Sequence, residues 1–384
     1  MIRTAARACL CFALSVSGAH AADTEIKAAF GQTFEASDNR RLEPNSTGAS
    51  YSSISTLLVN AIARTARATF EVVGNLAYRA YGGPGEQMQP DLLDKGIVGI
   101  ANYRTADSKY FIIASYQQRD ASTVQLEEDG FATLTGYVNT STLTGGFERQ
   151  IGPTDSVSLS VTGTMTDFTD SANGSPFNSI AARTAWNRKV NRSLDWVAAL
   201  EFQRLSYDNL TNTQSQVARF TTGVRYRHSP RLAFAANVGV GWFDTQNDPF
   251  GLALAPSGDN IGFVGDLLIT YNIWRDTVAI LSASQTMGPN SLGELSTRSA
   301  LAMSLRHEID HRSYWALGGQ VGRTSQTTEG PTGFLVASAT YGRRLTRDWR
   351  TELSYAYRMR DSSTGDADSN TITFRLSRDW VVQP

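Results

Sequence analysis

Two histidines four residues apart are the first candidates for chemistry. His307-Glu308-Ile309-Asp310-His311 matches H-E-x-x-H, a pattern in which one helix presents both imidazoles to zinc and the glutamate acts as a base. Here the pattern falls between two stretches of strand-like alternation, 296–306 and 313–323, and no third ligand is evident. We therefore predict a short polar turn at this point, and expect neither a metal nor another cofactor.

Nucleophile and calcium patterns are equally weak. Beyond residue 21 the histidines are His228, His307 and His311, and all three fall at expected turns, so no Ser–His pair is placed to act as a hydrolase. Residues 366–370 open like a calcium loop, but Thr371 stands where that loop needs glycine and Ser377 stands where it needs glutamate. We predict a solvated loop there, and we predict no enzymatic activity.

Charge is the stronger chemical signal, because arginine recurs on one face of strand-like segments. Rings of arginine favour anions in pores, whereas arginine–carboxylate pairs would brace a protein wall. Both signs are interspersed on this face, so both interpretations stay open. The candidate residues lining a lumen are Arg67, Arg79, Arg183, Arg219, Arg225, Arg298, Arg350, Glu352, Arg358 and Arg375.

The elements that must position these charges are strands with two different faces. From Ala66 onward, stretches of roughly ten residues alternate apolar and polar side chains, as strands of a half-buried sheet do. The clearest case has Leu, Phe, Ala, Val, Val and Trp at even positions 232–242, with small or polar residues between them. One such strand would also suit a soluble β-sandwich. The number of strands and the turn lengths must therefore distinguish a soluble fold from a membrane barrel.

Short and long connections alternate regularly through the second half of the chain. Outer-membrane barrels have this asymmetry, with tight periplasmic turns and longer external loops. The short connections are 152–155, 187–192, 228–230, 274–276, 307–312 and 342–347, and the long ones are 169–177, 206–213, 244–259, 287–294, 324–331 and 361–368.

These features predict an all-β fold, a transmembrane antiparallel up-and-down barrel of about 18 strands, with 16 as the alternative. The first strand is expected near 25–36, the last near 369–380, and both termini in the periplasm. Residues 119–136 are ambiguous, since they suit a long loop, a short helix or an extra pair of strands.

The start of the chain predicts export. Arg3 and Arg7 precede a short apolar run, and Ala19-His20-Ala21 resembles a cleavage site, so residues 1–21 are predicted to be a secretory signal and 22–384 a single barrel domain. Both cysteines lie within that signal. Without Arg3 and Arg7, the 35 basic residues fall to 33 against 36 acidic ones, which argues against nucleic acid as a partner.

The opening strand 26–35, which runs into Ser37-Asp38-Asn39, and the hairpin series that ends at 371–380 resemble the outer-membrane β-barrel porins of proteobacteria. Within that group the chain is similar to barrels associated with exopolysaccharide biosynthesis and export. Its C-terminus departs from the usual aromatic end, because four residues follow Trp380. The resemblance transfers no catalytic residue.

What the resemblance implies is a channel or export accessory in the outer membrane of a Gram-negative cell. The implied partners are the lipid bilayer, the barrel-assembly machinery during biogenesis, and polysaccharide or small anionic solutes as cargo. The alternative function is a structural or adhesive barrel with a plugged lumen, acting through its external loops. Loops folded into the lumen would favour that alternative.

Overall fold

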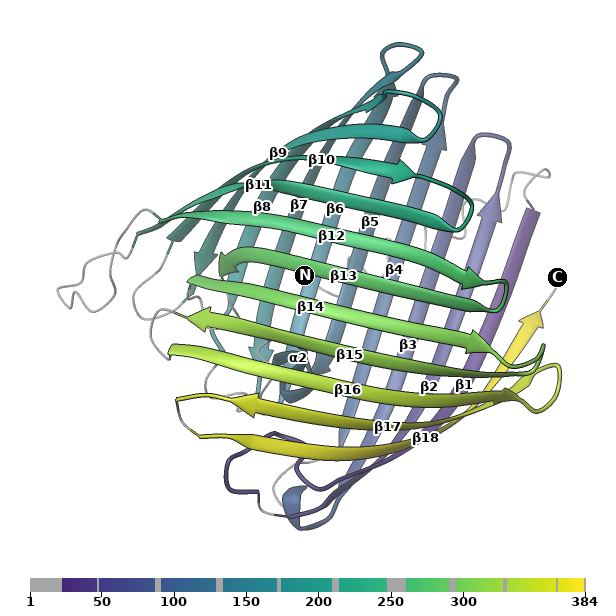
Figure 1. The fold of residues 1–384 in the computed structure, drawn as a ribbon, viewed down its shortest axis with the longest axis vertical. Helices are drawn as coiled ribbons and strands as arrows, with labels where there is room; N and C mark the ends of the chain where they lie inside the picture. The colour runs from purple at the N-terminus through teal and green to yellow at the C-terminus, as the bar shows by residue number, and fades with distance from the viewer. Residues whose placement is uncertain are drawn as a thin grey trace.

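The chain folds into a closed antiparallel barrel of 18 strands, as the alternation predicted (Figure 1). This computed structural model describes residues 23–46, 48–86, 91–128, 134–170, 174–208, 214–246, 260–289, 295–326, 330–363 and 365–382. Each strand pairs with its neighbours in sequence, and β1 pairs with β18 to close the barrel. The predicted signal at 1–21 lies outside the described residues and stays a prediction.

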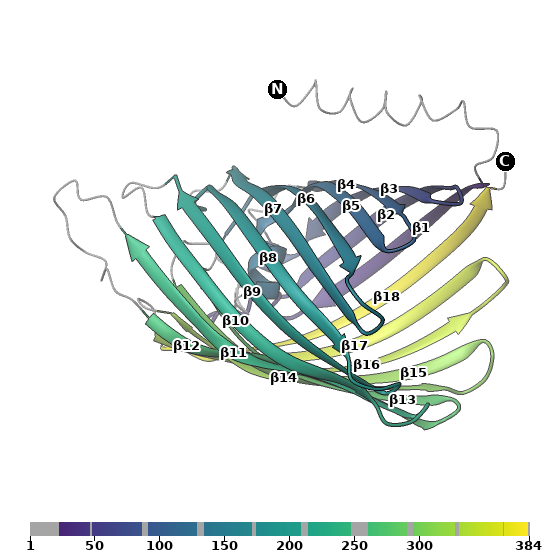
Figure 2. The ribbon, with the colours of Figure 1, turned by 90° about the horizontal axis from the view of Figure 1, so that it is seen from above.

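The strands have nearly uniform lengths, and Figure 2 shows how steeply they tilt around the barrel. Their bounds are β1 (Asp23–Ser37), β2 (Ser50–Arg64), β3 (Ala68–Gly82), β4 (Leu92–Arg104), β5 (Ser108–Asp120), β6 (Tyr137–Gln150), β7 (Asp155–Thr169), β8 (Phe177–Lys189), β9 (Leu194–Tyr207), β10 (Gln214–Arg227), β11 (Leu232–Gln246), β12 (Asn260–Trp274), β13 (Thr277–Pro289), β14 (Leu295–Glu308), β15 (Ser313–Gln326), β16 (Gly330–Arg344), β17 (Trp349–Asp361) and β18 (Ala367–Val382). Two short helices interrupt them, η2 (Pro84–Glu86) and α2 (Ala121–Glu128).

The two faces of each strand have opposite surroundings. In β7, Leu159, Val161 and Met165 are exposed on the outside of the barrel. The residues between them face inward, where the hydroxyls of Thr162 and Thr144 are 3.0 Å apart across the strand pair β7–β6. An apolar outer face and a polar inner face suit a barrel with lipid outside and water inside.

Aromatic side chains gather on the outer face beside the short turns. Trp186 and Trp196 pack edge to face with ring centroids 5.0 Å apart. The guanidinium of Arg378 lies over the rings of both Trp349 and Trp380, 5.5 and 5.1 Å from their centroids. Such a girdle marks a membrane–water interface, and here it marks the end of the barrel with the short connections.

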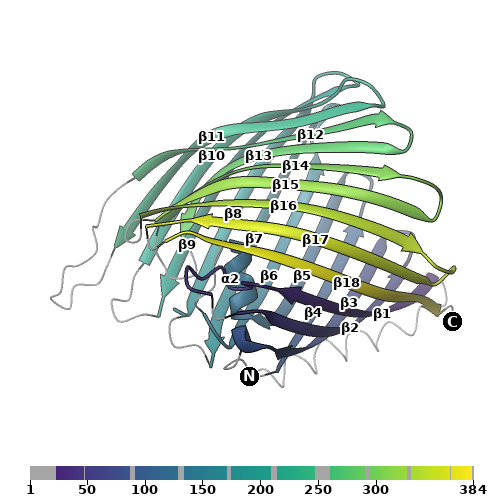
Figure 3. The same cartoon turned by 60° about the horizontal axis from the view of Figure 1, so that its bottom comes forward.

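The ambiguous segment 119–136 contains a short helix, so the second of the three alternatives is correct. Helix α2 lies inside the ring of strands, as the views in Figures 1 and 3 agree. Ala121 and Gln125 are each 1% exposed. Residues 129–133 lie outside the described part of the chain, and Leu134 is again buried. No helix in the described ranges has the length and apolar character needed to cross a membrane.

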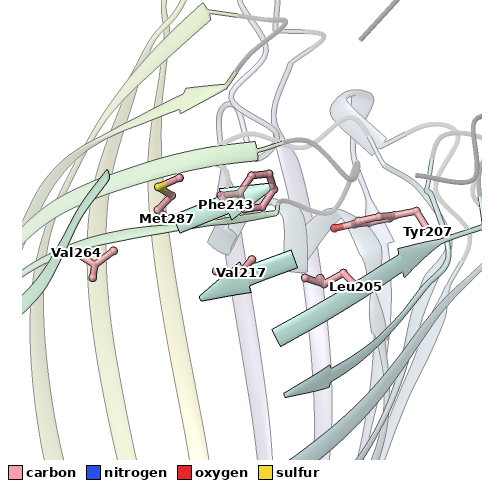
Figure 4. Close-up of a cluster of buried hydrophobic side chains, with 6 residues drawn as sticks. All are labelled: Leu205, Tyr207, Val217, Phe243, Val264 and Met287. Atoms are coloured by element: carbon pink, nitrogen blue, oxygen red, sulfur yellow. The ribbon is translucent and has the colours of Figure 1, made fainter. Parts of the chain in front are cut away.

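An apolar cluster covers part of the inner face at the long-loop end of β9 to β13. Its members come from five neighbouring strands, and Phe177 of β8 packs against them. Figure 4 shows these side chains, which are Leu205, Tyr207, Val217, Phe243, Val264 and Met287. The inner face is therefore polar along most of its length but locally dry at this end.

Candidate functional site

Helix α2 is fixed to the barrel wall by the carboxylate of Asp120, the last residue of β5. Arg40, from the loop after β1, donates to Oδ2 of Asp120 at 3.0 Å, and the Tyr81 hydroxyl donates to the same atom at 3.0 Å. The hydroxyls of Ser122 and Thr123, in the first turn of α2, also donate to this carboxylate. The Asp120 side chain is fully buried and that of Arg40 is 11% exposed. A charge so buried is stable only when it is paired and hydrogen-bonded.

A second buried ion pair extends this network along the wall. Arg79 of β3 donates to Asp94 of β4 at 2.7 Å, and the other oxygen of Asp94 accepts the backbone N–H of Asp120 at 2.9 Å. The network therefore runs continuously from Arg79 through Asp94 and Asp120 to Arg40. It holds α2 in one position within the lumen.

Two spaces flank α2. One, of about 470 Å³, has among its lining residues Gln125, Thr164, Arg219 and Arg298. The other, of about 320 Å³, is lined by residues that include Glu35, Arg40, Arg79, Thr123, Arg298 and Arg358. Arg298 of β14 lies beside both spaces, because it faces α2 from the opposite wall.

The arginines on the opposite wall differ in how they are held. Arg219 donates to Glu201 at 2.7 Å and to the backbone oxygen of Met287 at 2.7 Å. Arg298 has its guanidinium carbon 5.2 Å from the centroid of the Phe334 ring. Arg358 forms no ion pair and no hydrogen bond with any described residue. Its positive charge is thus not neutralised by any side chain that the structure describes.

The other predicted residues lie nearer the short-turn end, apart from one. Arg183 and Arg225 line a space of about 690 Å³ that Asp195 also lines, and Arg183 is 3.9 Å from Glu201. Arg350, Glu352 and Arg375 line a further space of about 320 Å³. Arg350 is 3.4 Å from Asp379, and Glu352 accepts a hydrogen bond from Tyr314 at 2.8 Å.

Arg67 is the exception among the predicted lumen residues. The strand expected from residue 66 begins at Ala68, so Arg67 lies exposed in the short turn between β2 and β3. Its backbone oxygen accepts the N–H of Arg104 at 2.8 Å. Arg67 is therefore at the rim of the barrel, away from the space around α2.

Several residues of this site were not predicted from the sequence. Arg40 lies in a loop, where no periodicity indicates which way a side chain points. Asp120 was inside the ambiguous segment, and Tyr81 gave no signal beyond its place in a strand. The only available indication was that 119–136 did not continue the hairpin pattern.

The H-E-x-x-H segment spans the end of β14 and the turn after it, so the turn was predicted correctly although the strand continues through Glu308. His307 lies in β14 beside Trp315, and its Nδ1 is 2.8 Å from the Thr277 hydroxyl. The ring of His311 lies in the turn, where its Nε2 accepts a hydrogen bond from Arg312 at 3.2 Å. Among the described residues no group of three or more His, Cys, Asp or Glu side chains could hold a metal ion.

Comparison with known proteins shows the fold but no close relative. No family model matches the sequence, and no curated protein matches it. Among solved structures, OccK2 (OpdF) of Pseudomonas aeruginosa is 8% identical with a TM-score of 0.55, covering 94% of this chain and 99% of that chain. A BenF-like porin from Pseudomonas fluorescens Pf-5 is 10% identical with a TM-score of 0.53, covering 93% and 99%. OccK2 was also solved in complex with glucuronate.

The shared architecture and the outer surface together give the location. A closed 18-stranded barrel whose outer face exposes apolar side chains is stable only where lipid covers that face. The chain is accordingly a bacterial outer-membrane barrel, which is the location that the sequence resemblance predicted. The exopolysaccharide association has no counterpart among these comparisons.

Proposed function

We propose that this barrel is an outer-membrane channel for small anionic solutes, narrowed by α2. The observation that carries the proposal is the guanidinium of Arg358, which lines the 320 Å³ space beside α2 and has no ion pair with any described residue. Arg40, Arg79 and Arg298 line the same space. The likeness in fold to porins supports a channel. The arginines support a negatively charged solute.

Among the described side chains that line this space, four are arginines and one, Glu35, is acidic. Four guanidinium groups face the carboxylate of Glu35 and the two carboxylates of Asp94 and Asp120 that anchor the network. A fixed charge in a narrow lumen with low-dielectric walls raises the local concentration of ions of opposite sign. The buried network holds its charges in place before a solute arrives, so little reorganisation opposes binding.

A plugged structural barrel is the alternative, because α2 is a segment folded into the lumen. The two spaces beside α2 favour the channel, since a plug that filled the lumen would leave neither. Volumes of about 470 and 320 Å³ suit a small solute better than a polymer. Polysaccharide export therefore stays a prediction from the sequence resemblance.

Liposome swelling tests the proposal with glucose and glucuronate, two solutes of similar size and different charge. We expect faster swelling with glucuronate, and we expect Arg358→Ser to remove most of the difference. Arg67→Ser is the matched control, because it removes an arginine at the rim. Absence of swelling with both sugars would support the plugged barrel instead.

A further inference from the structure

The outer face of β11 to β16 carries a row of unusually small and polar residues. Cross-strand register joins Gly265, Gln285, Ser299, Arg323 and Gly333 into one row, which Val238 of β11 ends on one side. Cross-strand partners share a face, and the next outward row contains Leu267, Leu301 and Val321. This row therefore lies on the lipid-facing side of the barrel.

The small residues form the floor of a groove of about 720 Å³ on the lipid side. Gly265, Ala283 and Ser299 lie low between larger neighbours. Phe263 and Val321 form its sides, and each is about half exposed, at 53% and 49%. The Phe263 ring lies over Gly265, where an added Cβ would approach the ring to 3.3 Å. A groove of this volume with apolar sides has the chemistry that an acyl chain requires.

Arg323 provides a charge at one end of this groove. It is exposed on the outer face, and it forms neither an ion pair nor a hydrogen bond with any described residue. Arg204, another arginine on the outer face, instead donates to Gln214 at 2.8 Å. An arginine without a partner among the described residues needs an anion or water to complete its hydrogen bonds.

The height of Arg323 selects the leaflet. It lies eight residues along β15 from Trp315, which belongs to the aromatic girdle at the short-turn end. Eight strand residues at the usual tilt rise about 20 Å, close to the full height of the apolar band of such barrels. Arg323 is thus level with the headgroups of the leaflet on the long-loop side, which we predict to be the external leaflet.

We propose that the β12–β15 groove binds a phosphorylated, multiply acylated glycolipid of the external leaflet. One acyl chain lies between Phe263 and Val321, and a phosphate accepts hydrogen bonds from the Arg323 guanidinium. The Ser299 hydroxyl, which lies next to Arg323 in the register, supplies a further donor. The site is separate from the lumen, so it does not depend on the solute that the channel carries.

Native mass spectrometry of the purified full-length barrel tests the site with bisphosphorylated lipid A as the probe. We expect Arg323→Gln to weaken retention of lipid A about tenfold, as loss of a charge-assisted contact does. Ala283→Phe, which fills the groove and keeps the arginine, should also weaken it. Arg204→Gln is the matched control and should bind like the parent protein.

Two further lipids test how much the phosphate contributes to binding and whether a phospholipid can replace lipid A. Dephosphorylated lipid A should bind about tenfold more weakly than the bisphosphorylated form, because it lacks the anion. Phosphatidylglycerol should bind more weakly than bisphosphorylated lipid A, since its two chains and single phosphodiester cover less of the barrel surface. Equal retention of all three lipids, or of lipid A by the parent and Arg323→Gln, would overturn the proposal. Heat-modifiable migration on gels confirms that each variant is folded.

Discussion

Asp38 and Asn370 connect the first strand, β1, to the last strand, β18, at the long-loop end of the barrel. The Asp38 carboxylate accepts the backbone N–H of Asn370 at 2.7 Å through Oδ1 and the Asn370 side-chain amide at 2.7 Å through Oδ2. Asn39 adds a hydrogen bond to the backbone oxygen of Asp368 at 3.1 Å. The Ser37-Asp38-Asn39 motif and the calcium-like segment 366–370 are therefore two halves of one clasp between β1 and β18.

Removing this clasp should loosen barrel closure. Asp38→Ala deletes both hydrogen bonds to Asn370, and we expect a loss of about 1 kcal/mol in the free energy of unfolding, since the site is solvated. Urea unfolding in lipid vesicles, followed by tryptophan fluorescence, measures the change. Asp366→Ala is the control, because Asp366 is exposed beside the clasp. An equal loss in both variants would contradict this role.

The clasp should also depend on pH. Partial burial raises the pKa of Asp38, but the hydrogen bonds from Asn370 outweigh it, so the pKa is lowered. A lowered folded-state pKa gives a stabilisation that is complete above the unfolded value of about 3.9 and lost as pH falls through the folded value. The stability difference between the parent and Asp38→Ala should therefore persist at pH 6 and shrink below about pH 4. A constant difference down to pH 2 would exclude the ionised carboxylate as its source.

Asp120 should control the position of α2. Asp120→Ala leaves Arg40 without its carboxylate and removes the acceptor for Ser122 and Thr123, so α2 should detach from the wall. Breaking a buried ion pair in this way costs about 3–5 kcal/mol. We expect hydrogen exchange in 121–128 to accelerate by at least tenfold. Unchanged exchange in α2 would show that other contacts hold the helix.

The orientation of the barrel can be read from labelling of single cysteines. Asp366→Cys, between β17 and β18, should react with an impermeant maleimide on intact cells, because the long connections face outward. Ile309→Cys, in the turn between β14 and β15, should react only after the outer membrane is permeabilised. The reverse pattern would invert the assignment of the two ends.

The regular part of the fold could be predicted because lipid imposes a simple rule on every strand. Each second residue of β7 or β11 must be apolar, so period-two alternation gave the strand number and the faces. Strand ends were less certain, and Arg67 was assigned to a strand although it lies in a turn. The alternation continues into the turn there, and pattern alone cannot place the boundary.

The inside of the barrel was harder to predict for a physical reason. Its wall is polar along most of its length, and the sequence period shows only that a residue points inward. It does not show which inward residues contact one another. The pair of Arg79 with Asp94 joins neighbouring strands and was foreseeable as wall bracing. The pair of Arg40 with Asp120 joins residues 80 positions apart through a loop, and only the folded chain brings them together.

Ion selectivity across a planar lipid bilayer tests the central claim most directly. In a potassium chloride gradient, the reversal potential of the purified barrel should show preference for chloride, and the preference should grow at low salt because screening weakens. Arg358→Ser should shift the reversal potential toward potassium, whereas Arg67→Ser should not. Potassium preference in the parent protein, or no conductance at all, would contradict an anion channel lined by the arginines beside α2.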